Sequence, residues 1–161
     1  GEKERILYNG FSRVLNIALI EDIREKIGGV YSISSKVSLS PNNFGEDKMI
    51  ISFSCDTKRT EELKNAVLKT VSDMLNKDID QKQIDSIIKN YELSYKNELK
   101  ENIFWLNYFY QKSTVNPKYK VPTPEEYAKI MQKKDLMESA KKAINLNNYI
   151  DVTLVPEKES L

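Results

Sequence analysis

The sequence has no histidine, and its 161 residues include a single cysteine, Cys55. Zinc sites in proteins are built mainly from histidine and cysteine side chains, so this chain lacks the ligands of an ordinary zinc site. Serine–histidine–aspartate and cysteine–histidine catalysis are excluded for the same reason. One cysteine forms no internal disulfide, and cysteine usage therefore does not reveal the redox compartment. Any hydrolytic chemistry must use other groups, or ligands supplied from elsewhere.

Long apolar runs, an excess of one charge and phosphate-binding loops are also missing. No apolar run approaches the roughly 18 residues needed to span a bilayer. With 25 basic and 24 acidic residues the formal net charge is +1, which argues against a dedicated nucleic-acid surface. The pair Gly28–Gly29 lacks the spacing of either nucleotide-binding fingerprint. The sequence therefore predicts no membrane span, no nucleic-acid partner and no cofactor-binding loop.

What is present is typical of one globular domain. Apolar residues make up 40% of the chain and charged residues 30%. A chain of this length buries roughly two-thirds of its unfolded surface. Apolar residues that recur every three or four positions predict helices at residues 4–27, 60–76, 80–112, 124–132 and 135–145. The third of these either continues unbroken or bends near Lys100.

Three shorter segments alternate apolar and polar residues, which indicates strands with one buried face. Residues 30–40 and 49–55 are joined by "PNNFGED" at residues 41–47, and a loop of this length predicts an antiparallel hairpin. Residues 149–155 are predicted as the last strand, with their apolar side chains on one face.

The order of these elements predicts an α+β fold. We expect a two-layer sandwich, with a mainly antiparallel sheet covered on one face by helices. Three strands make a thin sheet for this many helices, so the domain is expected to lack its first strand or strands. No internal repeat divides the chain, and we expect residues 1–161 to form a single α/β domain excised from a longer chain.

Two groups of residues have ordinary structural explanations. The aromatic cluster at residues 104–110 has helical spacing, which is more typical of a core or an interface than of a ligand surface. The carboxylate pairs Glu61/Glu62 and Glu125/Glu126 lie in the first turns of predicted helices, where the helix dipole favours them. Adjacent positions on a helix also point in different directions, so these pairs are poor catalytic dyads.

Arg24 and Tyr31 flank Gly28–Gly29, where the helical pattern ends and the strand pattern begins. Alternation alone places Tyr31 on the buried face with Ile33, and it leaves Arg24 as a surface arginine. The glycine pair could instead alter the local twist and re-aim Tyr31. Arginine offers five fixed donors and tyrosine one hydroxyl donor. Together they would hold a carbonyl oxygen and stabilise the charge that develops on it.

Four longer stretches follow one another along the chain. They are YNGFSRVLNIALIEDIREKIGGVYSISS, MIISFSCDTKRTEELKNAVLKTVSDM, YKNELKENIFWLNYF and DLMESAKKAINLNNYIDVTLVPE. In their order and spacing they resemble the C-terminal halves of pitrilysin/insulinase-type zinc metallopeptidases, and the resemblance covers nearly the whole chain. Residues 1–161 are then expected to be a C-terminal peptidase-like domain.

The resemblance implies an enzyme of two halves that enclose a chamber. Its N-terminal half carries the zinc motif H-x-x-E-H and a downstream glutamate ligand. The C-terminal half lacks the metal, and in catalytic members it contributes an arginine and a tyrosine seven residues apart. Arg24 and Tyr31 match that separation and context. The resemblance therefore implies an auxiliary catalytic role for these two residues, toward a substrate carbonyl or oxyanion.

Without histidine, this chain cannot hold the zinc of that family. No metal or other cofactor is expected in it, zinc is expected in the N-terminal half of the parent protein, and the chain alone is expected to be an inactive peptidase domain. The implied partners are that zinc-binding half, on the same polypeptide or another subunit, and a peptide substrate. The bacterial periplasm or cytoplasm is the expected compartment, and the sequence does not name the peptide.

Two alternatives stay open at this point. Proteins of the same fold also serve as non-catalytic structural or partner subunits, in which Arg24 and Tyr31 would have no role. The chain could also be an unrelated α+β binding module, and a structure without a sheet-and-helix layer arrangement would support that interpretation.

Overall fold

The computed structural model describes residues 2–38 and 48–156. The predicted hairpin loop at residues 41–47 and the last two residues of the first predicted strand lie outside this part. The elements in chain order are α1 (Glu2–Leu19), η1 (Ile20–Ile27), β1 (Val30–Ser38), β2 (Lys48–Cys55), η2 (Thr57–Arg59), α2 (Thr60–Asn76), α3 (Gln81–Glu98), α4 (Asn102–Tyr110), η3 (Gln111–Val115), α5 (Pro124–Ile130) and α6 (Lys133–Ala143). Of the shorter elements, η1 and η3 are π-helical and η2 is a 3₁₀ turn.

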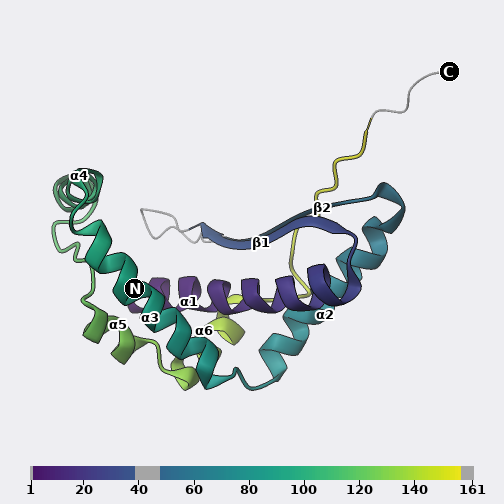
Figure 1. Ribbon diagram of the computed structural model, residues 1–161, viewed down its shortest axis with the longest axis horizontal. Coiled ribbons are helices and arrows are strands. Elements are labelled where there is room, and N and C mark those ends of the chain that lie inside the picture. The colour runs from purple at the N-terminus through teal and green to yellow at the C-terminus, as the bar shows by residue number, and fades with distance from the viewer. Residues whose placement is uncertain (1, 39–47, 157–161) are drawn as a thin grey trace.

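Helix α1 runs through the middle of the molecule, with the sheet along one side of it (Figure 1). It contacts β1 and also α2, α3, α5 and α6. Phe11, Leu15 and Leu19 recur every four residues on α1, and all three are fully buried. Val30 and Ile33 of β1 join the same core. This arrangement confirms the predicted α+β fold, in which helices cover one face of an antiparallel sheet.

Strands β1 and β2 form a two-stranded antiparallel sheet within the described residues, as the hairpin prediction required. Ile33 lies opposite Phe53, and both pack against the core. Polar contacts tie the same face of the sheet to α1. The Ser35 amide donates to Asn16 Oδ1 at 3.0 Å, and the hydroxyls of Ser35 and Ser12 are 2.9 Å apart. The buried hydroxyl of Ser12 thus has a partner.

The other helices begin and end largely where the sequence predicts. Helix α2 has the predicted bounds, and the chain bends near Lys100 between α3 and α4 instead of continuing as one helix. Helix α5 begins with the predicted capping box. Thr123 Oγ1 accepts from the Glu126 amide at 3.3 Å, and Glu126 Oε2 accepts from the Thr123 amide at 2.9 Å. Two backbone donors at the start of α5 are satisfied in this way.

The strand predicted at residues 149–155 is wrong, because this segment has no regular structure. Its alternating apolar side chains are largely exposed, at Ile150, Val152 and Leu154. Alternation makes a strand only where a neighbouring strand accepts its backbone hydrogen bonds, and no described strand pairs with it. The segment is instead held to α2 by an ion pair between Lys64 and Asp151, with Nζ and Oδ2 2.8 Å apart.

The aromatic cluster of α4 does not belong to the core. None of the residues of α4 is buried, and Phe109 is 61% exposed. The rings contact one another instead, with the Trp105 centroid 6.0 Å from Tyr108 and 6.2 Å from Phe109. Helix α4 also stands apart from α1 (Figure 1). The core interpretation is therefore wrong, and the interface interpretation stays a prediction.

Candidate functional site

An irregular segment joins helix α1 to the sheet, and we call residues 24–31 the connecting turn. It begins inside η1, whose hydrogen bonds span five residues, so that the Gly28 amide donates to the Ile23 carbonyl at 2.9 Å. Gly28 and Gly29 follow with φ of 69° and 89°, a region that glycine adopts at low cost. The helix ends there, and the chain turns back along α1 as β1 (Figure 1). Segments of π-helix are rare and are frequent at functional sites.

Tyr31 is the extra residue of a β-bulge. Val30 pairs with Cys55, and Ser32 pairs with Ser54, so β1 advances two residues where β2 advances one. The bulge leaves Val30 buried and turns Tyr31 to the outer face, where its side chain is 79% exposed. Simple alternation, which places Tyr31 on the buried face, is therefore wrong at this position. An outward ring was the other alternative that the sequence left open.

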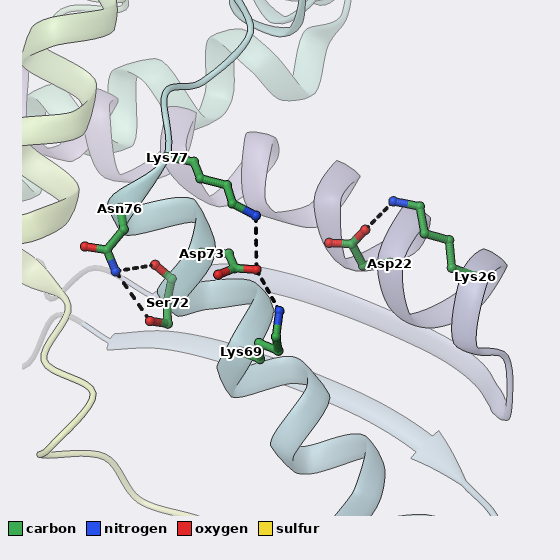
Figure 2. Close-up of polar contacts among 7 residues, drawn as sticks. All are labelled: Asp22, Lys26, Lys69, Ser72, Asp73, Asn76 and Lys77. Atoms are coloured by element: carbon green, nitrogen blue, oxygen red, sulfur yellow. Dashed lines mark hydrogen bonds and ion pairs between the residues drawn. The ribbon is translucent and has the colours of Figure 1, made fainter.

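Arg24 is exposed on η1, before the glycine pair. It makes no hydrogen bond or ion pair with another residue that the structure describes, so its guanidinium donors are uncommitted. Beside it, Lys26 and Asp22 form an ion pair with Nζ and Oδ1 2.6 Å apart (Figure 2). No hydrogen bond joins Arg24 to Tyr31 within the described residues. The structure leaves both side chains exposed, at the two ends of the connecting turn.

The second polar group in Figure 2 lies on α2 and has a local explanation. Asp73 accepts from Lys69 at 3.1 Å and from Lys77 at 3.2 Å, and these hydrogen bonds lower the pKa of its carboxyl. Asn76 Nδ2 donates to the Ser72 carbonyl at 2.9 Å. All of these contacts span four residues, which is typical of a solvated helix face. They do not mark a functional site.

Arg59, at the end of η2, holds the connecting turn from the side of α2. Its Nη1 donates to the Gly28 carbonyl at 3.2 Å. Its Nε and Nη2 donate to the two carboxylate oxygens of Glu62, at 2.9 and 2.6 Å. A side chain at Gly29 would place its Cβ 2.0 Å from Arg59 Nη1, so the guanidinium lies directly against this glycine.

Sequence reasoning missed Arg59 and gave Glu62 a role only at the helix dipole. The available signal was the three-residue spacing between them, which suits an ion pair at the start of α2. The contact with Gly28 is 31 residues away in sequence, and no local pattern predicts it. The hydrogen bonds of this pair raise the pKa of the Arg59 guanidinium and lower the pKa of the Glu62 carboxyl. Both groups are therefore charged near neutral pH.

The residues of this chain do not fit a zinc ion. The sequence has no histidine, and the described residues contain no group of three or more cysteine, aspartate or glutamate side chains able to hold a metal. Tetrahedral zinc needs three or four such ligands converging on one point. In the part of the chain that the structure describes, no helix is both long enough and apolar enough to cross a membrane.

Comparison with known proteins identifies the family. The sequence profile described as "Peptidase M16 inactive domain" matches residues 6–91, more than half of the chain. The fold is similar to that in "The crystal structure of the periplasmic protease PqqL from Escherichia coli", with a TM-score of 0.69 and 19% identity. The match covers 87% of this chain but 16% of that one, and at this identity it shows the fold alone. No curated protein matches.

These findings confirm the resemblance drawn from the sequence, and the third interpretation, an unrelated binding module, is excluded. The profile includes most of α1, the connecting turn, the hairpin and α2, and thus every residue of the candidate site. The chain therefore belongs to the peptidase M16 family and carries its inactive-type, C-terminal domain.

Proposed function

We propose that this chain is the metal-free half of a zinc metalloendopeptidase, which closes the substrate chamber and helps to bind peptide and stabilise the transition state. The outward orientation of Tyr31 carries this proposal. A tyrosine on the buried face of β1 would be unable to reach a substrate, whereas the bulge leaves its ring 79% exposed. The π-helical turn likewise leaves Arg24 exposed, with no partner for its donors among the residues that the structure describes.

The two side chains supply complementary hydrogen-bond donors. Attack on a peptide bond places negative charge on the former carbonyl oxygen, and a donor aimed at that oxygen stabilises the transition state. In our proposal the Tyr31 hydroxyl donates to this oxygen, and the Arg24 guanidinium anchors an adjacent substrate carbonyl. Because β1 and β2 form a sheet of only two strands within the described residues, an extended peptide can also add along a strand edge.

The metal chemistry of this proposal belongs to a partner half, on the same polypeptide or on another subunit. When bound there, zinc would supply the activated water. The chain has no histidine and its described residues include no group able to hold a metal, so the chain alone is expected to show no peptidase activity.

Tyr31→Phe in the complete peptidase tests the proposal. Removal of one such donor typically lowers the rate by about 10²–10³-fold. We expect a loss of that order in the cleavage of fluorescently labelled casein and of internally quenched random peptides, with the zinc content unchanged. Arg24→Ala should lower the rate as well.

Two exposed residues give matched controls. Tyr110→Phe removes the hydroxyl of a ring that is 56% exposed on α4. Arg13→Ala removes an exposed arginine from α1. Both controls should cleave at the wild-type rate. Normal rates for Tyr31→Phe and Arg24→Ala together would refute the assignment.

The alternative is a non-catalytic structural or partner subunit of the same fold, and the surface of α4 favours it. Leu106, Phe109 and Tyr110 are all more than half exposed, and apolar surface of this kind often marks a contact with another protein. The complete reading frame and its neighbours discriminate between the two. Absence of an H-x-x-E-H motif from both would rule out the peptidase and favour the subunit.

A further inference from the structure

The guanidinium of Arg59 bridges two parts of the fold that are distant in sequence. Its side chain is 34% exposed, and its hydrogen bonds go to Glu62 on one side and to the Gly28 carbonyl on the other. A bidentate arginine–carboxylate pair fixes the plane of the guanidinium more firmly than a single contact does. The donor that faces Gly28 is therefore held in one direction.

Local structure also fixes the backbone of Arg59. The end of β2 lies beside the start of β1, because Cys55 pairs with Val30. The chain then enters η2, where Asp56 Oδ1 accepts from the Lys58 amide at 2.8 Å. Arg59 thus follows the strand end after a short capped turn, and its side chain reaches the connecting turn from there.

The Arg59 guanidinium packs against the connecting turn at Gly29. A Cβ there would lie 2.0 Å from Arg59 Nη1 and 2.8 Å from Cζ, whereas a Cβ at Gly28 would meet no atom within 4 Å. Both glycines have positive φ, so a side chain strains the backbone at either one. Only Gly29 additionally makes room for Arg59. Both glycines therefore allow the backbone its positive φ, and Gly29 in addition leaves space for the Arg59 side chain.

We infer that Arg59 is a positioning residue for the substrate-contacting pair Arg24 and Tyr31. Tyr31 lies two residues after Gly29, and Arg24 lies four residues before Gly28. The contact of Arg59 with the two glycines, which we call the clamp, therefore sets where both side chains point. Glu62 acts through Arg59, because it holds the guanidinium plane. This inference rests on the proposed function and extends it to residues that touch no substrate.

A double-mutant cycle in the complete peptidase tests the inference. A misplacement of about 1 Å at a reacting group can cost about 10²-fold in rate. We expect Arg59→Ala to lower kcat by about ten- to 100-fold in the wild-type background, and by less than about twofold when Arg24→Ala and Tyr31→Phe are already present. When residues act as one unit, a second mutation has little further effect on the rate once the first has removed the function of the unit.

The cycle separates positioning from general support of the fold. A merely structural role would lower the rate by the same factor in both backgrounds, and that additive result would overturn the inference. So would a wild-type rate for Arg59→Ala. Lys69→Ala, which removes an ion pair to Asp73 on α2 without touching the connecting turn, is the control and should leave kcat unchanged.

Three further variants keep the test decisive if Arg59→Ala does not fold. Glu62→Gln should lower kcat in the same background-dependent way, although by a smaller factor. Gly29→Ala should lower kcat more than Gly28→Ala, because only a Cβ at Gly29 would meet Arg59. Equal effects of the two glycine variants would contradict the clamp.

The two proposals fail in different ways. If the proposed function is wrong, Tyr31→Phe and Arg24→Ala cleave at normal rates, and a positioning role toward them falls as well. If only the positioning role is wrong, the double variant Arg24→Ala with Tyr31→Phe is slow, and Arg59→Ala lowers its rate further by the full factor seen in the wild type.

Discussion

At the scale of single residues, a stacked pair of tyrosines ties α3 to α5. The ring centroids of Tyr91 and Tyr127 are 3.9 Å apart and their planes differ by 8°. The Tyr91 hydroxyl donates to the Pro122 carbonyl at 2.7 Å. Burial is the main cause that raises the pKa of both hydroxyls, since an ionised phenolate would lose its hydration there. The neutral form of each ring is therefore the one that the fold accommodates.

These tyrosines predict a loss of stability in alkali. Folding raises the pKa of these hydroxyls because the fold favours their neutral form. Their contribution to stability is therefore complete below the unfolded pKa, about 10 for tyrosine, and is lost as pH rises through the folded pKa. We expect the free energy of unfolding in urea to fall above about pH 10, and to fall less steeply in Tyr91→Phe. Tyr110→Phe, on exposed α4, should follow the wild type. Equal slopes for Tyr91→Phe and the wild type would contradict this account.

Single residues also mark the limit of sequence reasoning at the candidate site. The position of Arg24 on the surface and the helix stop at Gly28 follow from local patterns. The direction of Tyr31 does not, because one extra residue in β1 reverses the face that alternation assigns. Arg59 is harder still, since its contact with Gly28 depends on the tertiary pairing of β1 with β2. The periodicity of apolar residues predicts neither the direction of Tyr31 nor the contact between Arg59 and Gly28.

At the scale of elements, the capping box of α5 gives a measurable contribution. Thr123→Ala removes the oxygen that accepts from the Glu126 amide, and loss of such a cap typically costs about 1 kcal/mol. We expect the urea midpoint to fall accordingly, with an unchanged slope. Thr114→Ala, at an exposed position of η3, should leave the midpoint within error. A wild-type midpoint for Thr123→Ala would show that the cap does not stabilise the fold.

Elements defined by their own sequence were predictable, and elements that need a distant partner were not. Helix α2 has its predicted bounds because its apolar stripe and first-turn carboxylates are local signals. The break between α3 and α4 was one of two stated alternatives. Residues 149–155 alternate as a strand does, yet no described strand pairs with them, and they stay irregular. A strand is a property of a sheet, whereas a helix satisfies its own backbone.

At the scale of the whole molecule, the core lies around α1, and α4 stands outside it. Phe11→Ala should lower the free energy of unfolding by about 3–5 kcal/mol, because a fully buried ring leaves a cavity. Leu106→Ser, at a side chain that is 65% exposed, should change it by less than about 0.5 kcal/mol. Urea unfolding of the two variants measures both values. A large loss for Leu106→Ser would mean that α4 packs into the core.

The whole molecule also fits the auxiliary role proposed for it. It belongs to the inactive-type domain of its family, it has no histidine, and it spans 16% of the length of the solved protease that it resembles. Its proposed contribution to catalysis is therefore geometric: two exposed donors on an irregular turn that Arg59 holds in place.

The most direct test of this account is the rate of peptide cleavage by the complete peptidase carrying both Arg24→Ala and Tyr31→Phe, expressed per bound zinc. We expect a decrease of at least about 10²-fold, because the proposed donors to the oxyanion and to an adjacent substrate carbonyl are gone while the metal half is intact. The matched double variant Arg13→Ala with Tyr110→Phe should retain the wild-type rate. A rate for the first variant equal to that of its control would contradict the central claim.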